Sequence, residues 1–305
     1  MPRPRTEVGA VLGLTLVTAA WGSTFFLIKD VVTVLPVADF LAVRFWIAAV
    51  VMLAVFWPHV RRLDALAWRR GLLLGVVYAV AQLLQTVGLQ HTSASVSGFV
   101  TGMYVVLTPV LGALLLRQRT PASTWLAVLL ATGGLAVLSL RGFAIGFGEG
   151  VTLVSAAVYA LHIIGLGAWS TQKDALGLST VQMLAIAGGC TVAALPGGIQ
   201  TPSDGRVWVA VLYMALIAGA GALVIQTWAQ AHLPATRAAI VMTTEPVFAA
   251  LFAVLFGGES LGPRVLIGGA LVLAAMYLAE LGPRRNRREV TAALDPPSEA
   301  LHHEP

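Results

Sequence analysis

One carboxylate stands out because it lies near the middle of a long apolar stretch, that of Glu245. A charged carboxylate at the centre of a bilayer is costly unless it is paired, hydrated or protonated. Pro246 follows it and lacks the backbone N–H that a helix uses, so the helix opens locally here. An opened turn beside a carboxylate can bind a cation, a proton or an ammonium group. The alternative is a structural glutamate bonded to a neighbouring helix; we assign Glu245 and Pro246 to coupling or gating.

Arg44 and His162 are further ionisable residues in apolar stretches. The long side chain of Arg44 either snorkels to the membrane interface, or holds an outer gate or a substrate carboxylate. Together with Glu245 it is compatible with an amphoteric solute. Histidine titrates near physiological pH, so His162 either relays protons and contacts substrate, or is a packing residue. No pair of histidines has the spacing of metal ligands, so no metal site is predicted.

Amides, hydroxyls and aromatic side chains recur in the same apolar stretches. In hydrocarbon such groups need partners, either across helix interfaces or along a wet cavity. Gln82 and Gln85 are three residues apart and share one helical face. Trp21 and Tyr159 either close a cavity, stack on a substrate, or simply pack. The predicted substrate-binding or cavity residues are Trp21, Ser23, Gln82, Gln85, Thr101, Tyr104, Tyr159, His162, Gln226, Trp228 and Thr244.

The composition shows which elements must position these residues. Only 11% of the 305 residues are charged, 58% are hydrophobic, and the mean hydropathy is +0.85, whereas a globular protein carries ~25% charge. Continuous apolar runs predict membrane-spanning helices, because an outer-membrane barrel would alternate apolar and polar residues. Within one such run, Gly98 and Gly102 form a face that permits close helix contact. The predicted spans are 9–30, 38–57, 71–90, 94–116, 121–140, 150–170, 178–198, 207–228, 235–256 and 263–281.

Several functions are excluded by what the sequence lacks. Loops this short leave no room for a soluble catalytic domain. Neither Lys29 nor Lys173 ends a glycine-rich phosphate loop, so the chain has no ATPase of its own. The only cysteine, Cys190, has no disulfide partner. We therefore expect no cofactor and no enzyme activity.

The basic residues predict the orientation. Most of the nineteen lysines and arginines face the cytoplasm if both termini are inside, whereas Lys29, Arg141, Arg206 and Arg264 face out. This distribution explains the pI of about 9.9 without nucleic acid, and it leaves the cluster 284–288 beside lipid headgroups. The prediction is a multi-pass protein of the cell membrane, plasma or inner, with both termini cytoplasmic and lipids around it.

An internal repeat divides the chain. A shift of 141 residues places four residues on identical ones: Gln85, Thr86, His91 and Ala94 on Gln226, Thr227, His232 and Ala235. Five helices per half is an odd number, so the second half enters the membrane inverted. The predicted organisation is a cytoplasmic segment 1–8, a five-helix repeat 9–141, an inverted five-helix repeat 142–281, and a disordered cytoplasmic tail 282–305. The fold class is therefore all-α, with ten transmembrane helices.

Several motifs resemble the EamA type of the drug/metabolite transporter superfamily. They are Trp21-Gly22-Ser23-Thr24-Phe25 with Lys29, Pro36 followed by Arg44, Gly98 to Tyr104 continuing to Pro109, and Thr244-Glu245-Pro246-Val247. The resemblance implies a ten-helix carrier with a central cavity between two repeats. Because the family pattern also has an arginine in the second helix, it favours a gate or packing role for Arg44. The family's acidic residue after the ninth helix matches Glu259, but its counterpart after the fourth reads Arg117-Gln118-Arg119, so we assign that position no coupling role.

The predicted function is secondary-active transport, specifically export, of small metabolites or drugs by alternating access. Energy would come from protons or a counter-solute. The alternatives are a facilitative, channel-like pore and an integral membrane enzyme acting on lipids, the latter disfavoured because the loops are short and poor in acids.

Overall fold

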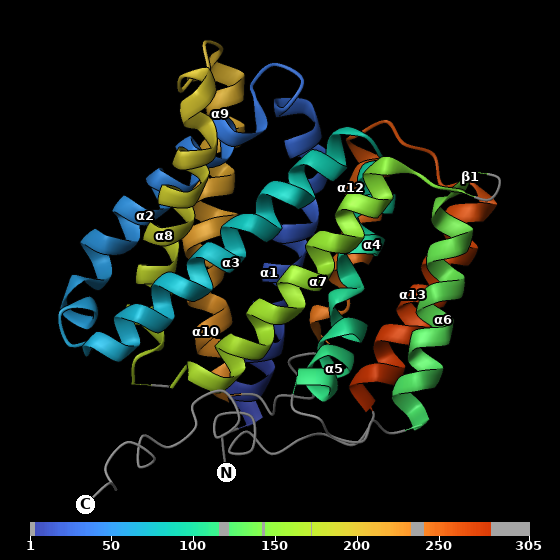
Figure 1. Ribbon diagram of the computed structural model, residues 1–305, viewed down its shortest axis with the longest axis horizontal. Helices are drawn as coiled ribbons and strands as arrows, with labels where there is room; N and C mark the ends of the chain where they lie inside the picture. Colours follow the sequence, from blue (N-terminus) through green and yellow to red (C-terminus); the bar gives the residue numbers. More distant parts are fainter. Residues whose placement is uncertain (1–3, 116–121, 142–143, 172, 233–240, 282–305) are drawn as a thin grey trace, which may run out of the picture.

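The computed structural model describes residues 4–115, 122–141, 144–171, 173–232 and 241–281, and they form a bundle of helices (Figure 1). The α-helices are α1 Pro4–Val31, α2 Val37–Val60, α3 Ala65–Gln90, α4 Ala94–Gly102, α5 Tyr104–Leu115, α6 Ala122–Ser139, α7 Phe147–Trp169, α8 Ala175–Ala194, α9 Gly205–Ala215, α10 Ala222–His232, α12 Glu245–Leu255 and α13 Pro263–Leu281. Two-residue strands, β1 Leu140–Arg141 and β2 Ala144–Ile145, pair antiparallel between α6 and α7.

The described residues contain seven segments long and apolar enough to cross a membrane. They are Val8–Val31, Val37–Val60, Ala65–Gln90, Ala94–Leu115, Phe147–Leu166, Ala175–Gly197 and Gly205–Gln226. Shorter apolar helices cover Trp125–Leu138, Glu245–Leu255 and Pro263–Leu278. The predicted helical membrane architecture is thus confirmed in its coarse form. Some predicted segments lie outside the described residues: the tail 282–305, residues 1–3 of the N-terminal segment, residues 235–240 of the ninth predicted span, and the Arg117-Gln118-Arg119 position after the fourth.

Two of the spans predicted as continuous helices are interrupted, which corrects the prediction, and a third opens beside Pro246 as predicted. Met103 separates α4 from α5, and a π-helical turn over Leu216–Gly221 separates α9 from α10. The third interruption precedes α12, which begins at Glu245. Pro246 lies in its first turn, where a helix needs no N–H donor, so the local sequence favours a helix start rather than a helix middle. π-turns and helix breaks of this kind often occur at functional sites.

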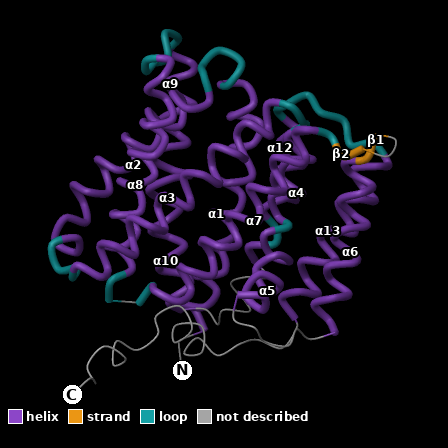
Figure 2. Tube along the Cα trace, in the orientation of Figure 1, coloured by secondary structure: helices purple, strands orange, loops and turns teal. Residues whose placement is uncertain are grey.

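The helices pack in long pairs that run through the bundle (Figure 2). α2 packs on α8, α6 on α13, α3 on α7 and α8, α1 on α10 and α12, and α4 on α12. One apolar core surrounds Phe40 and Phe45 of α2 and Met214 of α9. A second surrounds Phe99 of α4 and Met276 of α13. Helices from distant parts of the chain therefore share each core.

Close contact between α4 and α12 depends on the predicted glycine face. A methyl group on Gly98 would come within 2.6 Å of the Ala249 Cβ atom, and one on Gly102 within 3.1 Å of the Met276 Cε atom. The first distance is too short for any side chain, since interiors are already close-packed. The expectation that this face permits tight packing is confirmed, and it holds α12 beside the break between α4 and α5.

The two ends of the bundle carry different connections (Figure 1). We call the end at which α1 begins the base, and the opposite end the crown. α13 ends at the base, and the turn between α2 and α3 also lies there. The turns between α3 and α4, between α8 and α9, and between α12 and α13 lie at the crown.

Candidate functional site

A hydrogen-bonded group of polar side chains lies inside the bundle, where α3, α4 and α7 meet. The Tyr159 hydroxyl faces both amide oxygens of α3, at 2.7 Å from Gln82 Oε1 and 3.2 Å from Gln85 Oε1. The amide nitrogen of Gln85 donates to Thr101 Oγ1 at 3.1 Å. All four side chains are buried. Amides and hydroxyls in an apolar bundle need such partners, so this group holds three helices in one register.

Glu245 joins this group through Tyr104. The Tyr104 hydroxyl donates to Glu245 Oε2 at 3.2 Å, and the Tyr104 ring lies edge-on to Tyr159, with 6.5 Å between ring centroids. We call Gln82, Gln85, Thr101, Tyr104, Tyr159 and Glu245 the polar centre. Glu245 is half-buried, and no described lysine, arginine or histidine forms an ion pair with it. Its carboxylate can therefore accept a proton or a positively charged group.

Tyr78 was missed by the sequence analysis and lies at the edge of the polar centre. Its ring packs edge-on against Tyr159 at 5.2 Å, His162 at 5.1 Å and Phe45 at 6.5 Å. The signal was present, because Tyr78 precedes Gln82 by one helical turn and so shares its face. His162 lies next to it, buried, with Nε2 2.8 Å from Gln182 Oε1.

Arg44 points into the bundle instead of toward the membrane interface. Its side chain is only 6% exposed, and its guanidinium carbon lies 4.9 Å from the centroid of Phe45 and 5.9 Å from that of Phe40. The snorkelling interpretation is therefore wrong. Asp39, one turn earlier and also buried, accepts instead from the backbone N–H of Gln200 at 3.1 Å.

Other predicted cavity residues lie away from the polar centre. The Trp21 indole donates to the Ala218 carbonyl in the π-turn at 2.8 Å. Thr244 bonds Thr18 of α1 at 3.0 Å, and the Gln226 amide lies 4.0 Å from Met242 Sδ. Trp228 is 43% exposed and covers Gly9 and Gly13 of α1, so the structure does not place its ring with the polar centre.

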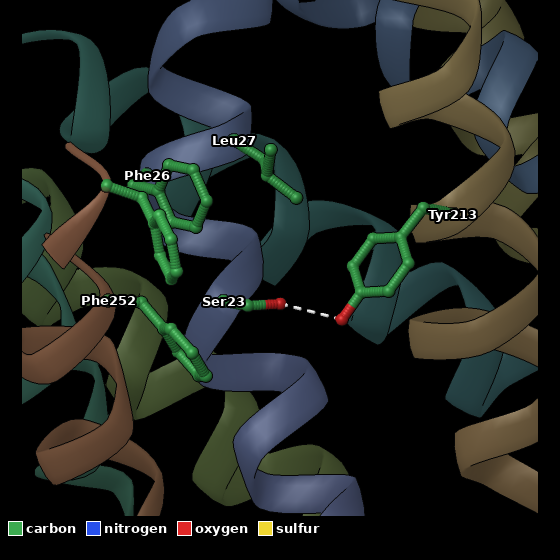
Figure 3. A pocket seen from close by; sticks show the side chains of 6 residues that line it. Ser23, Phe26, Leu27, Tyr213 and Phe252 are labelled. Atoms are coloured by element: carbon green, nitrogen blue, oxygen red, sulfur yellow. Dashed lines mark hydrogen bonds between the residues drawn. The ribbon is translucent and has the colours of Figure 1, made fainter.

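Ser23 also lies apart, in an apolar groove (Figure 3). Its hydroxyl is 2.8 Å from the Tyr213 hydroxyl of α9, and the two bridge a cavity of about 260 Å³. The lining residues are Ser23, Phe26, Leu27, Tyr213, Phe252 and Phe256. The groove and the polar centre share no residue. In an apolar helix, the sequence does not show which way a serine side chain points.

The crown holds a separate set of charged contacts, at the start of α4. Glu259 Oε1 accepts from the backbone N–H of Ala94 at 2.6 Å. Glu259 Oε2 accepts from the N–H and the hydroxyl of Ser95, at 3.1 and 2.6 Å. A carboxylate at this position satisfies free N–H groups of the first turn and complements the helix dipole. Glu259, noted in the sequence only for its match to a family position, is thus a cap supplied by a distant segment.

The same turn is bound from two further helices. Lys29 Nζ donates to the Thr92 carbonyl at 2.6 Å, and the Thr92 hydroxyl donates to Glu149 Oε1 at 2.8 Å. Residues 91–95 with Lys29, Glu149 and Glu259 form what we call the crown corner. It ties α1, α3 and α4 to α7 and to the connection that follows α12.

The described residues contain no group of three His, Cys, Asp or Glu side chains able to hold a metal ion. The donors of the polar centre are amides, hydroxyls and one carboxylate. Such a set suits hydrogen bonding to an organic solute or proton exchange.

Comparisons with known proteins agree with this architecture. A family model described as the EamA-like transporter family matches residues 8–140 and again residues 146–281. An uncharacterized transporter of Archaeoglobus fulgidus is 31% identical over 277 residues, which cover 89% of this chain and 86% of the relative. The uncharacterized transporter YetK of Bacillus subtilis is 28% identical over 187 residues, 58% of this chain and 57% of the relative. One crystal structure shares the fold, with a TM-score of 0.62 at 18% identity, covering 89% of this chain and 96% of that chain.

Proposed function

Because this chain belongs to the EamA-like transporter family, we propose that it is a secondary-active exporter of a small metabolite or drug that works by alternating access. The protein is a membrane transporter with a small-molecule substrate. The proposal adds the direction, the mechanism and the site: a central cavity at the polar centre, opened to one side of the cell membrane at a time. The observation that carries it is the bond between Tyr104 and Glu245.

That bond joins positions separated by the repeat offset of 141 residues. The same offset carries Gln85 and Thr101, which are bonded, onto Gln226 and Met242, which are also in contact. Equivalent residues of two repeats touch each other only near the axis that relates the repeats. The Tyr104–Glu245 pair therefore supports a substrate pathway along the repeat interface, where carriers of inverted-repeat design bind their solutes.

Helix packing supports ten crossings arranged as two inverted repeats, 9–141 and 142–281. Under the shift, α2 and α6 correspond to α8 and α13, and each packs on its own counterpart. The α3–α7 contact likewise corresponds to the contact between α10 and α1. α1 begins at the base whereas α7 begins at the crown (Figure 1), as inversion requires. The two matched family segments divide the chain at the same place.

We assign the coupling role to Glu245, with Pro246 as the point at which α12 can bend. A half-buried carboxylate held by one hydroxyl can exchange that partner for a proton or for the positive group of a counter-solute. Gln82, Gln85, Thr101, Tyr104, Tyr159 and His162 would line the cavity. The crown corner would be the gate, since its bonds join the two proposed repeats and must break if the crown opens.

The arginines of the turn between α2 and α3 favour the base as the cytoplasmic side. Arg61 and Arg62 are exposed in this turn, and the turn lies toward the same end of the bundle as the start of α1 (Figure 1). The positive-inside rule then places both termini in the cytoplasm.

Counterflow in proteoliposomes tests the proposal. The solute is first identified by comparing exported metabolites between overexpressing and deletion cells. A carrier preloaded with unlabelled solute accelerates entry of labelled solute, and a pH gradient drives its accumulation if protons are coupled. A channel-like pore would equilibrate the label without acceleration, and an enzyme would convert it chemically. Either result would overturn the proposal.

A further inference from the structure

Arg44 is a buried cation without a counter-ion among the described residues. Its Nε and Nη1 atoms are fully buried and make no hydrogen bond within the described part of the chain. A guanidinium carries five N–H donors, and burying a charge without partners is strongly unfavourable. The contrast with Lys29, whose amino group is bonded at the crown, shows that this fold does satisfy other cations. A packing role alone would leave this unfavourable burial unexplained.

The surroundings of Arg44 are aromatic. Phe45 and Phe40 lie near the guanidinium, and the Tyr78 ring packs edge-on against both Phe45 and Tyr159. The Tyr159 ring in turn lies edge-on to that of Tyr104, whose hydroxyl donates to Glu245. A series of ring contacts therefore leads from the buried cation to the carboxylate, and the two form no ion pair in the described part of the chain. Aromatic faces attract the cation but offer no acceptor in the plane of its N–H groups.

We propose that Arg44 is the anion-binding residue of the transport site, and that the solute carries a carboxylate which supplies the missing acceptors. The inference rests on the proposed transport function. Guanidinium and carboxylate match as a two-bond fork, and such charge-assisted pairs are the strongest in a low-dielectric interior. This role replaces the gate or packing role that the family resemblance favoured for Arg44.

The structure is closed around this residue, since Arg44 is only 6% exposed. A solute reaches it in a more open state, which alternating access provides. Phe45, Tyr78 and Tyr159 would then contact the apolar part of the solute. Release becomes possible when the carboxylate is again exposed to water, where the pair is weak.

Three probes of one shape test the charge preference on the detergent-purified protein: 3-phenylpropionate, 3-phenylpropanol and 3-phenylpropylamine. We expect the propionate to raise the melting temperature most. Replacing Arg44→Gln should weaken its binding about tenfold or more, the loss typical of a charge-assisted hydrogen bond. Arg44→Lys should retain part of the binding. Arg206→Gln, which removes an exposed arginine at the crown, should leave it unchanged.

The single cysteine provides a second measurement, whose main comparison uses the unmodified protein. Cys190 is fully buried on α8, in the same apolar core as Phe40 and Phe45, whose rings contact the Arg44 guanidinium. A negatively charged methanethiosulfonate should label Cys190 faster than a positively charged one of equal size, and 3-phenylpropionate should protect it. Arg44→Lys should keep the order of the two rates.

Equal binding of the three probes, together with equal labelling by both reagents, would mean that water alone satisfies Arg44 and would overturn the inference. Counterflow separates this failure from that of the proposed function. If a solute without a carboxylate shows trans-acceleration that 3-phenylpropionate does not affect, the proposed carrier function is supported and the anion site at Arg44 is overturned. If 3-phenylpropionate binds through Arg44 but no solute shows counterflow, the anion site is supported and the proposed carrier function is overturned.

Discussion

The crown corner and the middle of the bundle treat buried charge in opposite ways. At the crown corner, both oxygens of Glu259 accept hydrogen bonds and Lys29 donates one. In the middle of the bundle, Glu245 has one bond from a tyrosine, and Arg44 has none within the described chain. Satisfied charges hold elements in place, whereas unsatisfied ones have capacity for a ligand. On this basis we propose that the crown corner holds the closed arrangement together, whereas the middle of the bundle carries the transport chemistry.

The largest expected effect comes from neutralising the carboxylate of Glu245 in the middle of the bundle. Glu245→Gln keeps the shape and a hydrogen bond to Tyr104 but removes the negative charge. If Glu245 couples transport, solute accumulation driven by a gradient should fall at least about tenfold, which is the effect of about 1.4 kcal/mol. Uptake into proteoliposomes at several pH values measures it. Asp204→Asn is the matched control, since it neutralises an exposed helix cap at the crown where asparagine caps equally well. Unchanged accumulation at every pH would remove Glu245 from the mechanism.

Disrupting the packing of α4 on α12 beside the polar centre should reduce transport almost as strongly. Gly98→Val places a side chain where even a methyl group meets Ala249 at 2.6 Å. Separating α4 from α12 should cost about 1–3 kcal/mol and also move Tyr104 away from Glu245. Thermal unfolding in detergent and counterflow should both decline. Gly133→Val is the control, because nothing lies within 4 Å of a methyl group there. Equal stability of the two variants would contradict the packing.

A smaller effect is expected at the crown corner. Glu259→Gln keeps one acceptor for the start of α4 but loses the charge and one of the oxygen acceptors. The loss should be about 1 kcal/mol, as for other helix caps. Unlike Glu245→Gln, it should leave coupling intact and increase labelling from the crown side, measured with a cysteine introduced at His91. A loss of coupling equal to that of Glu245→Gln would break the distinction between the two regions.

The smallest effect is expected from Ser23→Ala. The change removes a bond to Tyr213 in the apolar groove (Figure 3), which lies apart from the polar centre. Stability should fall by about 1 kcal/mol or less, and the counterflow rate should change little. The counterflow rate of Ser23→Ala is compared with that of Tyr159→Phe, which removes two hydrogen bonds inside the polar centre. A stronger transport defect from Ser23→Ala would place the groove on the solute pathway.

The polar centre was partly predictable because two regularities survive in the sequence. Glutamines one turn apart share a helical face, and the 141-residue offset pairs positions in the two halves. The same offset links Tyr104 with Glu245, so their contact was accessible to the argument that paired Gln85 with Gln226. Tyr78 could likewise have been found from its spacing to Gln82.

Other placements could not be predicted. The helices are apolar on nearly every face, so periodicity does not say which side of a helix meets lipid and which meets protein. For this reason Trp228 and Ser23 were expected near the polar centre, whereas Trp228 lies 43% exposed and Ser23 faces the groove. The breaks at Met103 and in the π-turn also escaped, since a continuous apolar run looks the same with or without them.

The sequence by itself determined that the chain is an all-helical membrane protein with two related halves, because hydropathy and repeat spacing are local, additive properties. It also singled out Glu245 and Arg44, since charges are rare in apolar runs. Only the tertiary structure decided that Glu245 meets Tyr104, that Glu259 caps α4, and that Arg44 lacks an acceptor in the described chain. Whether a buried charge is satisfied depends on side chains far away in sequence, and packing alone brings them together or leaves them apart.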